Sequence, residues 1–199
     1  MSKISKLIKL ENRIMKCDKC PRLRKVTPIP YPHICMADNI DEVEFMFVGR
    51  NPGLEHSYED VSESKFLETY QKRWVASKAG KYIINKVGLL LIKNKSIWVN
   101  ICKCSSPDNS FLKPQEIKNC KIYLERQISI IKPRVIFTFG SEALKWFFPK
   151  ESLNKSHTKK IPLGNNRILI PMYHYAYFLR TKNVKKNKRQ NEVFKDIWM

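Results

Sequence analysis

Four short apolar runs are spread along the 199-residue chain, each bounded by polar or turn-forming residues. Their length and their content of Val, Ile and Phe predict buried β-strands. The predicted strands are Val43–Val48, Ser96–Asn100, Arg134–Phe139 and Arg167–Ile170. Segments with apolar residues at helical spacing accompany them at 3–15, 76–92, 114–131 and 141–148. This alternation predicts a three-layer α/β fold, with a central, mostly parallel four-stranded sheet and helices on both faces.

The remaining segments predict surface structure within one domain. Residues 21–35 contain four prolines and no clear period, which predicts an extended loop. Residues 181–191 are almost entirely basic or polar, which predicts a solvated loop ahead of a final helix. No internal repeat or second linker interrupts the pattern, so we expect a single domain over residues 1–199.

The charge of the chain narrows the choice of partner. It has 38 Lys and Arg residues against 18 Asp and Glu residues, a formal net charge of +20. Nucleic acid is the partner we expect, because phosphate contacts release counterions and a positive field steers the encounter. A merely solvated, Lys-rich surface is the alternative. A membrane surface is disfavoured, because no obvious helix combines a Lys-rich face with a bulky apolar one.

The N-terminal segment and the apolar runs predict a location. The first residues are too charged for a signal-peptide core, and the longest apolar run, 87–92, is too short to span a bilayer. We therefore expect a cytoplasmic protein whose six cysteines are metal ligands or buried thiols rather than disulfides.

The spacing of four of the cysteines suits a metal site. Cys17 and Cys20 form a Cys-x-x-Cys pair, and Cys104 and Cys120 lie in the second half of the chain. Four thiolates suit either zinc or an iron–sulfur cluster, and isolated buried thiols are the alternative. The two remaining cysteines, Cys35 and Cys102, are expected to be small buried hydrophobic residues.

Polar side chains follow three of the predicted strands. The first strand leads into Gly49-Arg-Asn51-Pro-Gly53, the second ends at Asn100, and the fourth leads into Pro171-Met-Tyr-His174. Ligand sites in parallel sheets lie at the carboxyl ends of the strands, so these groups are expected to meet at one edge.

In order and content, these motifs resemble the family 4 (iron–sulfur) uracil-DNA glycosylases over nearly the whole chain. The family's Cys-x-x-Cys-x-Leu-Arg corresponds, with one inserted residue, to Cys17-Asp-Lys-Cys20-Pro-Arg-Leu-Arg24. Its Val-Gly-Glu-x-Pro-Gly, Asn-x-x-Lys-Cys and Pro-x-Glu-Ile-x-x-Cys motifs correspond to Val48-Gly-Arg-Asn51-Pro-Gly53, Asn100-Ile-Cys-Lys-Cys104 and Pro114-Gln-Glu-Ile-Lys-Asn-Cys120. Its Pro-Phe-Val-Gly and His-Pro-Ser/Ala-Tyr-x-Leu-Arg motifs resemble Arg73-Trp74-Val-Ala76 and His174-Tyr-Ala-Tyr-Phe-Leu-Arg180.

The resemblance implies a uracil-DNA-glycosylase-like fold and a monofunctional DNA glycosylase. Asn51 would position water, and His174 would stabilise the departing base anion. Asn100 would hold the edge of a flipped base and Trp74 its face. The other implied roles are the base pocket for Gly49 and Tyr175, a phosphate for Arg180, and a [4Fe–4S] cluster for Cys17, Cys20, Cys104 and Cys120. DNA is the implied partner, and a monomer the commonest arrangement.

Departures from the family pattern leave the substrate open. The family orients its water with a Glu in the first loop, whereas the amide of Asn51 cannot take a proton from water. Gly-x-Asn-Pro-Gly is instead similar to the mismatch-specific and single-strand-selective branches of the superfamily. Tyr175 also replaces a Pro. Uracil is the default substrate. A modified, hypermodified or mismatched base is one alternative, and a noncatalytic iron–sulfur DNA-binding protein is another.

Overall fold

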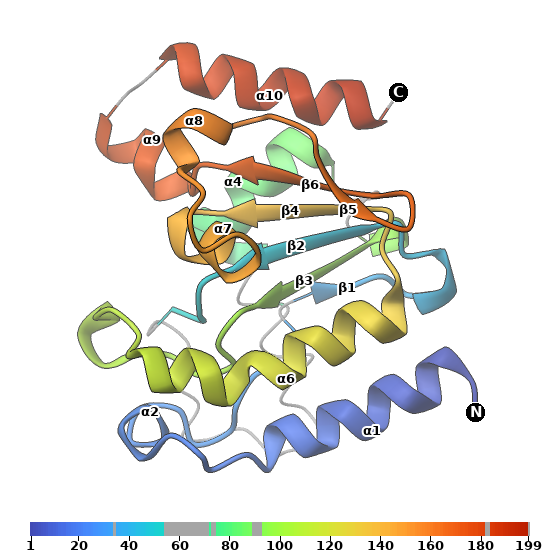
Figure 1. Cartoon of the computed structure of the whole chain (residues 1–199), viewed down its shortest axis with the longest axis vertical. Helices are drawn as coiled ribbons and strands as arrows, with labels where there is room; N and C mark the ends of the chain where they lie inside the picture. Colours follow the sequence, from blue (N-terminus) through green and yellow to red (C-terminus); the bar gives the residue numbers. More distant parts are fainter. Residues whose placement is uncertain (34, 54–71, 73–74, 89–92, 182–183, 199) are drawn as a thin grey trace.

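The computed structural model describes the chain apart from residues 34, 54–71, 73–74, 89–92, 182–183 and 199 (Figure 1). The strands are β1 (Cys35–Met36), β2 (Phe45–Gly49), β3 (Ser96–Asn100), β4 (Val135–Phe139), β5 (Ile161–Gly164) and β6 (Arg167–Met172). The helices are α1 (Lys3–Met15), α2 (Pro21–Arg24), α4 (Lys78–Val87), α6 (Pro114–Ile131), α7 (Ser141–Phe147), α8 (Leu153–Ser156), α9 (Tyr175–Thr181) and α10 (Val184–Trp198). None of these helices is long and apolar enough to cross a membrane.

The strands form one sheet in the order β1-β3-β2-β4-β6-β5. The inner four, β3, β2, β4 and β6, run parallel to one another, and they are the four strands that the sequence predicts. The sequence analysis missed the two antiparallel edge strands, β1 and β5. β1 has two residues and β5 alternates between half-buried and exposed, so neither carries the continuous apolar run of a buried strand. The α/β, mostly parallel prediction is confirmed, with six strands instead of four.

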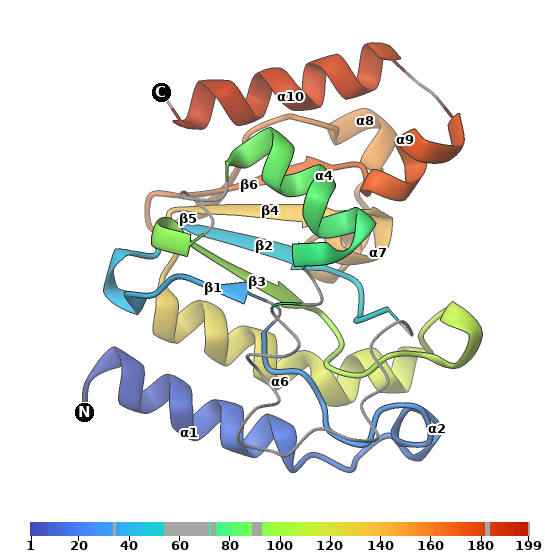
Figure 2. The ribbon, with the colours of Figure 1, turned by 180° about the vertical axis from the view of Figure 1, so that it is seen from behind.

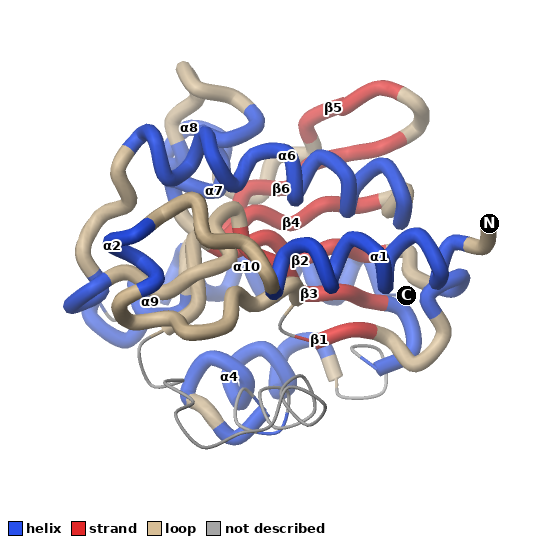
Figure 3. Tube along the Cα trace, turned by 90° about the horizontal axis from the view of Figure 1, so that it is seen from below, coloured by secondary structure: helices blue, strands red, loops and turns tan. Residues whose placement is uncertain are grey.

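Alternating side chains give the sheet two different faces. Met46 and Val48 of β2 point to the face covered by α1 and α6, whereas Phe45 and Phe47 point to the opposite face. Figure 1 shows α1, α6 and α7 on the near side, and Figure 2 shows α4 on the other side. Helices therefore cover both faces, as predicted. Seen from below, α1 and α6 run side by side along the sheet (Figure 3).

Aromatic rings dominate the second face. The ring of Phe47 stacks on those of Trp98 and Phe137, with centroids 5.2 Å apart in both pairs. Phe194 of α10 closes the layer against Phe137 at 5.6 Å. Phe47, Phe137 and Phe194 are fully buried, so this aromatic layer fixes how α10 sits on the sheet.

The helix ends follow from local chemistry. The hydroxyl of Ser2 caps α1 by accepting from the backbone N–H of Ser5 at 3.3 Å. Pro114 opens α6, and the Glu116 carboxylate accepts from the backbone N–H of Lys113 at 2.7 Å. The predicted bounds 3–15 and 114–131 are confirmed, and 141–148 is confirmed to within a residue. α4 covers the described centre of the predicted segment 76–92, whose end lies outside the described residues.

Two predicted loops are wrong in part. Residues 184–191, predicted as a solvated loop, form the first half of α10. Their buried face is polar, with Gln190 fully buried, so an apolar pattern could not reveal it. In the predicted loop 21–35, the first four residues form α2, whose Pro21 at the first position suits a helix start.

The carboxyl ends of the four parallel strands all lie on one side of the molecule. In Figure 1 the arrowheads of β2, β4 and β6 point toward the side where α2, α7 and α9 lie. The predicted loops after β2, β3 and β6 therefore do meet at the same edge of the sheet.

Candidate functional site

The last residues of β2 and β3 face each other across the parallel pair. Gly49 is the register partner of Asn100. A Cβ atom added to Gly49 would lie 2.5 Å from Oδ1 of Asn100, closer than real Cβ contacts allow. Gly49 therefore makes room for the Asn100 side chain, which is buried at the edge of the sheet. The backbone carbonyl of Asn100 accepts from Nζ of Lys103 at 2.7 Å.

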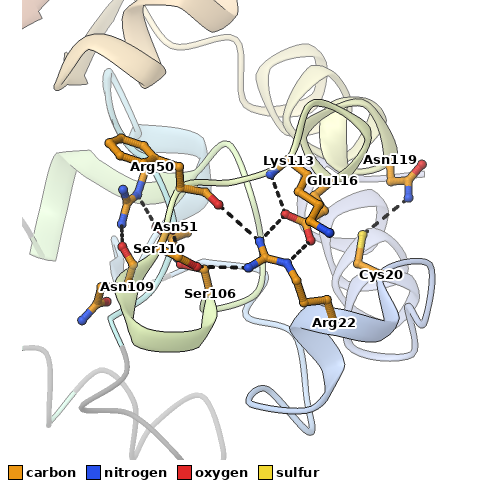
Figure 4. A network of polar contacts seen from close by, with 11 residues as sticks. Cys20, Arg22, Arg50, Asn51, Ser106, Asn109, Ser110, Lys113, Glu116 and Asn119 are labelled. Carbon is orange, nitrogen blue, oxygen red and sulfur yellow. Dashed lines mark hydrogen bonds and ion pairs between the residues drawn. The ribbon is translucent and has the colours of Figure 1, made fainter.

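Arg50 and Asn51 form the centre of a polar network on this edge (Figure 4). Oδ1 of Asn51 accepts from Nε of Arg50 at 2.6 Å, and Nδ2 of Asn51 donates to the Ser106 hydroxyl at 3.3 Å. The guanidinium of Arg50 also donates to Glu142 of α7 at 3.3 Å and to the carbonyl of Asn109 at 3.1 Å. The network holds the Asn51 amide in one orientation, and the contacts among the described residues use one of the two lone pairs of its carbonyl oxygen.

His174 lies just beyond β6, and its surroundings keep it neutral. Its Nδ1 accepts from the backbone N–H of Ala176 at 3.3 Å, so the neutral ring carries its proton on Nε2. Desolvation of the ring by the surrounding protein, together with the nearby cations Arg50 and Arg180, lowers the pKa of His174 to about 4. His174 is exposed as a whole residue, so water offsets part of the desolvation, while the two cations still disfavour the charged ring. At neutral pH the imidazole is therefore an uncharged donor.

The backbone before His174 is held by α10. The Gln190 side chain accepts from the N–H of Tyr173 at 2.9 Å and donates to its carbonyl at 3.2 Å. His157 lies 3.1 Å from the same Gln190 oxygen, and Lys186 donates to the Tyr173 hydroxyl at 2.9 Å. A fully buried amide that binds both backbone groups of one residue restricts the position of the next.

The remaining predicted site residues are Tyr175, Arg180 and Trp74, and the structure describes the first two. Tyr175 begins α9, half-buried, with its ring 4.3 Å from that of His174 and 6.3 Å from that of Tyr82. Arg180 is exposed on α9, close enough to His174 to affect its pKa. Trp74 lies outside the described residues. Asn51 and His174 are brought together through Arg50, which bonds the first and lowers the pKa of the second.

The four cysteines predicted as ligands come from separate segments. Cys17 follows α1, Cys20 directly precedes α2, Cys104 follows β3 and Cys120 lies in α6. Burial and the nearby thiols of Cys120, Cys17 and Cys20 raise the pKa of Cys104. All four thiols are therefore neighbours and are free of disulfides. In the described part of the chain, no three His, Cys, Asp or Glu side chains are arranged to hold a metal ion.

Nitrogen donors point at two of these sulfurs. The backbone N–H of Lys103 donates to Sγ of Cys120 at 3.4 Å, and the Asn119 amide donates to Sγ of Cys20 at 3.5 Å. The Cys102 thiol, fully buried as expected, also donates to Cys120 and is the main cause that lowers the Cys120 pKa to about 7. The side chain of Cys35 lies outside the described residues.

Arg50 is the site residue that the sequence analysis missed. Aligned residue by residue, the loop Val-Gly-Glu-x-Pro-Gly places its Glu on Arg50, and Asn51 takes the variable position. The motif therefore contained the signal, because a positively charged Arg stands where the family has a negatively charged Glu. Ser106, Glu142 and Gln190 carried no such signal, because their roles depend on contacts between distant segments.

Comparison with known proteins agrees with this arrangement. Residues 37–198 match the model of the uracil DNA glycosylase superfamily. The chain is 28% identical over 191 residues to the type-4 uracil-DNA glycosylase of Sulfurisphaera tokodaii, covering 90% of this chain and 79% of that protein. It is also 28% identical to the type-4 uracil-DNA glycosylase of Saccharolobus solfataricus, with 89% and 79% covered. The chain therefore belongs to the uracil DNA glycosylase superfamily.

Proposed function

We propose that this protein is a monofunctional DNA glycosylase that hydrolyses the N-glycosidic bond of uracil flipped out of DNA. The observation that carries the proposal is the neutral His174, which follows β6 at the same carboxyl edge of the sheet at which β2 leads into Asn51 and β3 ends at Asn100. Membership of the superfamily and the names of the relatives support it. So does the net charge of +20, which suits a polyanionic substrate.

His174 acts on the leaving base. As the bond between C1′ of the sugar and N1 of uracil breaks, the electron pair goes to the base and negative charge collects on its O2. Nε2–H of His174 donates a hydrogen bond to this oxygen, and a donor placed in advance stabilises the transition state more than the ground state. A neutral imidazole does this without giving up its proton.

Asn51 acts on the water. The free lone pair of its Oδ1 accepts a hydrogen bond from water, which then attacks C1′ and leaves an abasic site. Because an amide cannot take the proton, this proton passes to the departing base anion or to solvent. Asn51 is thus a positioning group for the nucleophile rather than a general base.

The remaining residues hold the nucleotide. Asn100 pairs with the edge of the base, and Gly49 and Tyr175 line the pocket. Trp74 stacks on the face of the base, and Arg180 binds a phosphate.

We further propose that Cys17, Cys20, Cys104 and Cys120 hold a [4Fe–4S] cluster. The four neighbouring thiols are the donors that such clusters require, and the N–H groups of Lys103 and Asn119 directed at two sulfurs are typical of their surroundings. When bound, the cluster joins the segment after α1 to α6. It takes no part in bond cleavage, which belongs to the residues at the sheet edge.

Arg50 favours a second candidate function. A cation in place of the family's Glu adds N–H donors to the pocket, so a modified or mismatched base with a further acceptor oxygen would gain a partner. A comparison of base release from different substrates separates this candidate, and a noncatalytic DNA-binding protein, from uracil excision.

Base release is the first prediction. The protein is incubated with oligonucleotides that contain uracil, hypoxanthine, 5-hydroxymethyluracil or a G·T mismatch, and abasic sites are cleaved by alkali. We expect breaks at uracil, and a rate lowered about 10²- to 10³-fold in His174→Ala. Breaks confined to another base would support the second candidate. Intact DNA with every substrate, from a protein that binds DNA, would contradict the proposal in favour of a noncatalytic reader.

The contact between Gly49 and Asn100 gives the second prediction. Gly49→Ala displaces the Asn100 side chain, so kcat/KM for uracil excision should fall about 10²-fold. Asn100→Ala should cause a similar loss, and the double variant should be no worse than Asn100→Ala alone, since the clash then has no partner. Independent, multiplying losses would show that Gly49 acts in some other way.

The metal content gives the third prediction. Purified without oxygen, the protein should contain about four iron atoms and four sulfides with visible absorption, and Cys104→Ser should lose them. Cys102→Ser is the matched control, two residues away and fully buried, and should keep its iron. Zinc instead of iron in the wild type, or equal loss in both variants, would refute the ligand assignment.

A further inference from the structure

The loop between β3 and α6 carries an aromatic side chain into solvent. Phe111 is 80% exposed, and among the described Phe, Tyr and Trp residues no other is exposed. A single exposed apolar residue is common on protein surfaces and shows nothing alone. The case of Phe111 is different because the backbone on both sides of it is held in place.

The residues on either side of Phe111 are held in place by packing and by hydrogen bonds. Leu112 is buried, and the carbonyl of Ser110 accepts from the Ser106 hydroxyl at 2.7 Å. Arg22 donates to the Ser110 hydroxyl at 3.0 Å and to the carbonyl of Phe111 at 3.3 Å. The exposed ring is thus held out by an ordered backbone, and little conformational entropy remains to be lost on binding.

Arg22 is itself fixed. Its guanidinium binds the Glu116 carboxylate through two hydrogen bonds of 2.8 and 2.7 Å, and Figure 4 shows it between α6 and the loop. Paired, bidentate contacts of this kind are both strong and directional. The Arg22–Glu116 ion pair therefore anchors the loop that carries Phe111.

The same loop reaches the candidate active site. Its Ser106 accepts from Asn51, and its Asn109 carbonyl accepts from Arg50. Phe111 follows Asn109 by two residues, so the loop that carries the ring borders the place where the flipped base would enter in the proposed function. Helix α9, which follows His174, offers no equivalent in its described aromatic residues, because Tyr175, Tyr177 and Phe178 pack against one another or against Tyr82.

We propose that Phe111 is the wedge that inserts into the DNA base stack when the target base is flipped out. The inference rests on the proposed function. Flipping leaves a gap in the stack, and an apolar side chain that fills it offsets the lost stacking. The ring suits this gap because every base presents a face on which an aromatic side chain can stack. A duplex needs this help, whereas a single strand has no paired stack to open.

The test compares duplex and single-stranded substrates. Phe111→Ala should lower kcat/KM for uracil in duplex DNA roughly 10- to 100-fold and leave single-stranded excision nearly unchanged. Phe111→Trp should restore the duplex activity. Ile8→Ala is the control, because it removes another exposed apolar side chain, 49% exposed on α1, and should affect neither substrate. Equal losses on both substrates, or none on the duplex, would overturn the proposal.

A second readout separates this proposal from the function on which it rests. A duplex with 2-aminopurine beside uracil is titrated with wild type and Phe111→Ala, and the fluorescence change reports unstacking without any cleavage. The wild type should give the change and Phe111→Ala should lose it. If no base is released but the fluorescence differs in this way, the excision proposal fails and the wedge stands. If uracil is released and the two proteins give the same fluorescence, the wedge fails alone.

Discussion

The close approach of Gly49 to Asn100 is the constraint on which the site depends. The parallel register of β2 and β3 sets the last residues of the two strands opposite each other, and only a residue without Cβ leaves room for the Asn100 amide. The same register directs the chain after Gly49 into Arg50 and Asn51. It also continues past the strand ends, where the N–H of Cys102 donates to the carbonyl of Arg50 at 3.0 Å. The residues proposed for base-edge recognition and for water positioning, and the cysteine-bearing loop, thus all follow from one backbone pairing.

From this edge, two arginines extend the organisation of the site. Arg50 connects Asn51 with Glu142 and Asn109, and it contributes to the low pKa of His174. Arg22 connects the segment that carries Cys20 with Glu116 and the loop around Phe111. A cluster bound by the cysteines would hold Arg22 in place and, through it, the surface that meets DNA. We therefore propose that the cluster would support DNA recognition, while the residues at the sheet edge would carry out the chemistry.

The sequence predicted those parts of the fold that leave a local pattern. The inner strands have continuous apolar runs, and α1 and α6 have apolar stripes and clear start signals, so their positions agree with the structure. The parallel arrangement then brought Asn51, Asn100 and His174 to one edge, as expected. The first half of α10 could not be predicted in this way, because its inner face is polar and Gln190 is buried through its bonds to Tyr173. The exposure of Phe111 likewise depends on contacts with Arg22, which lies 89 residues earlier in the chain.

The charge state of His174 is central to this mechanism, because neither Arg50 nor Asn51 provides the carboxylate that the family has in the first loop. The most direct measurement is the single-turnover rate of uracil release between about pH 5 and pH 8. With its pKa lowered to about 4, His174 stays neutral over most of this range, so the rate should remain constant as the pH falls to about 5.5. A rate that drops with a midpoint near the ordinary histidine pKa of about 6.5 would contradict this account, as would a rate that rises as the imidazole gains a proton.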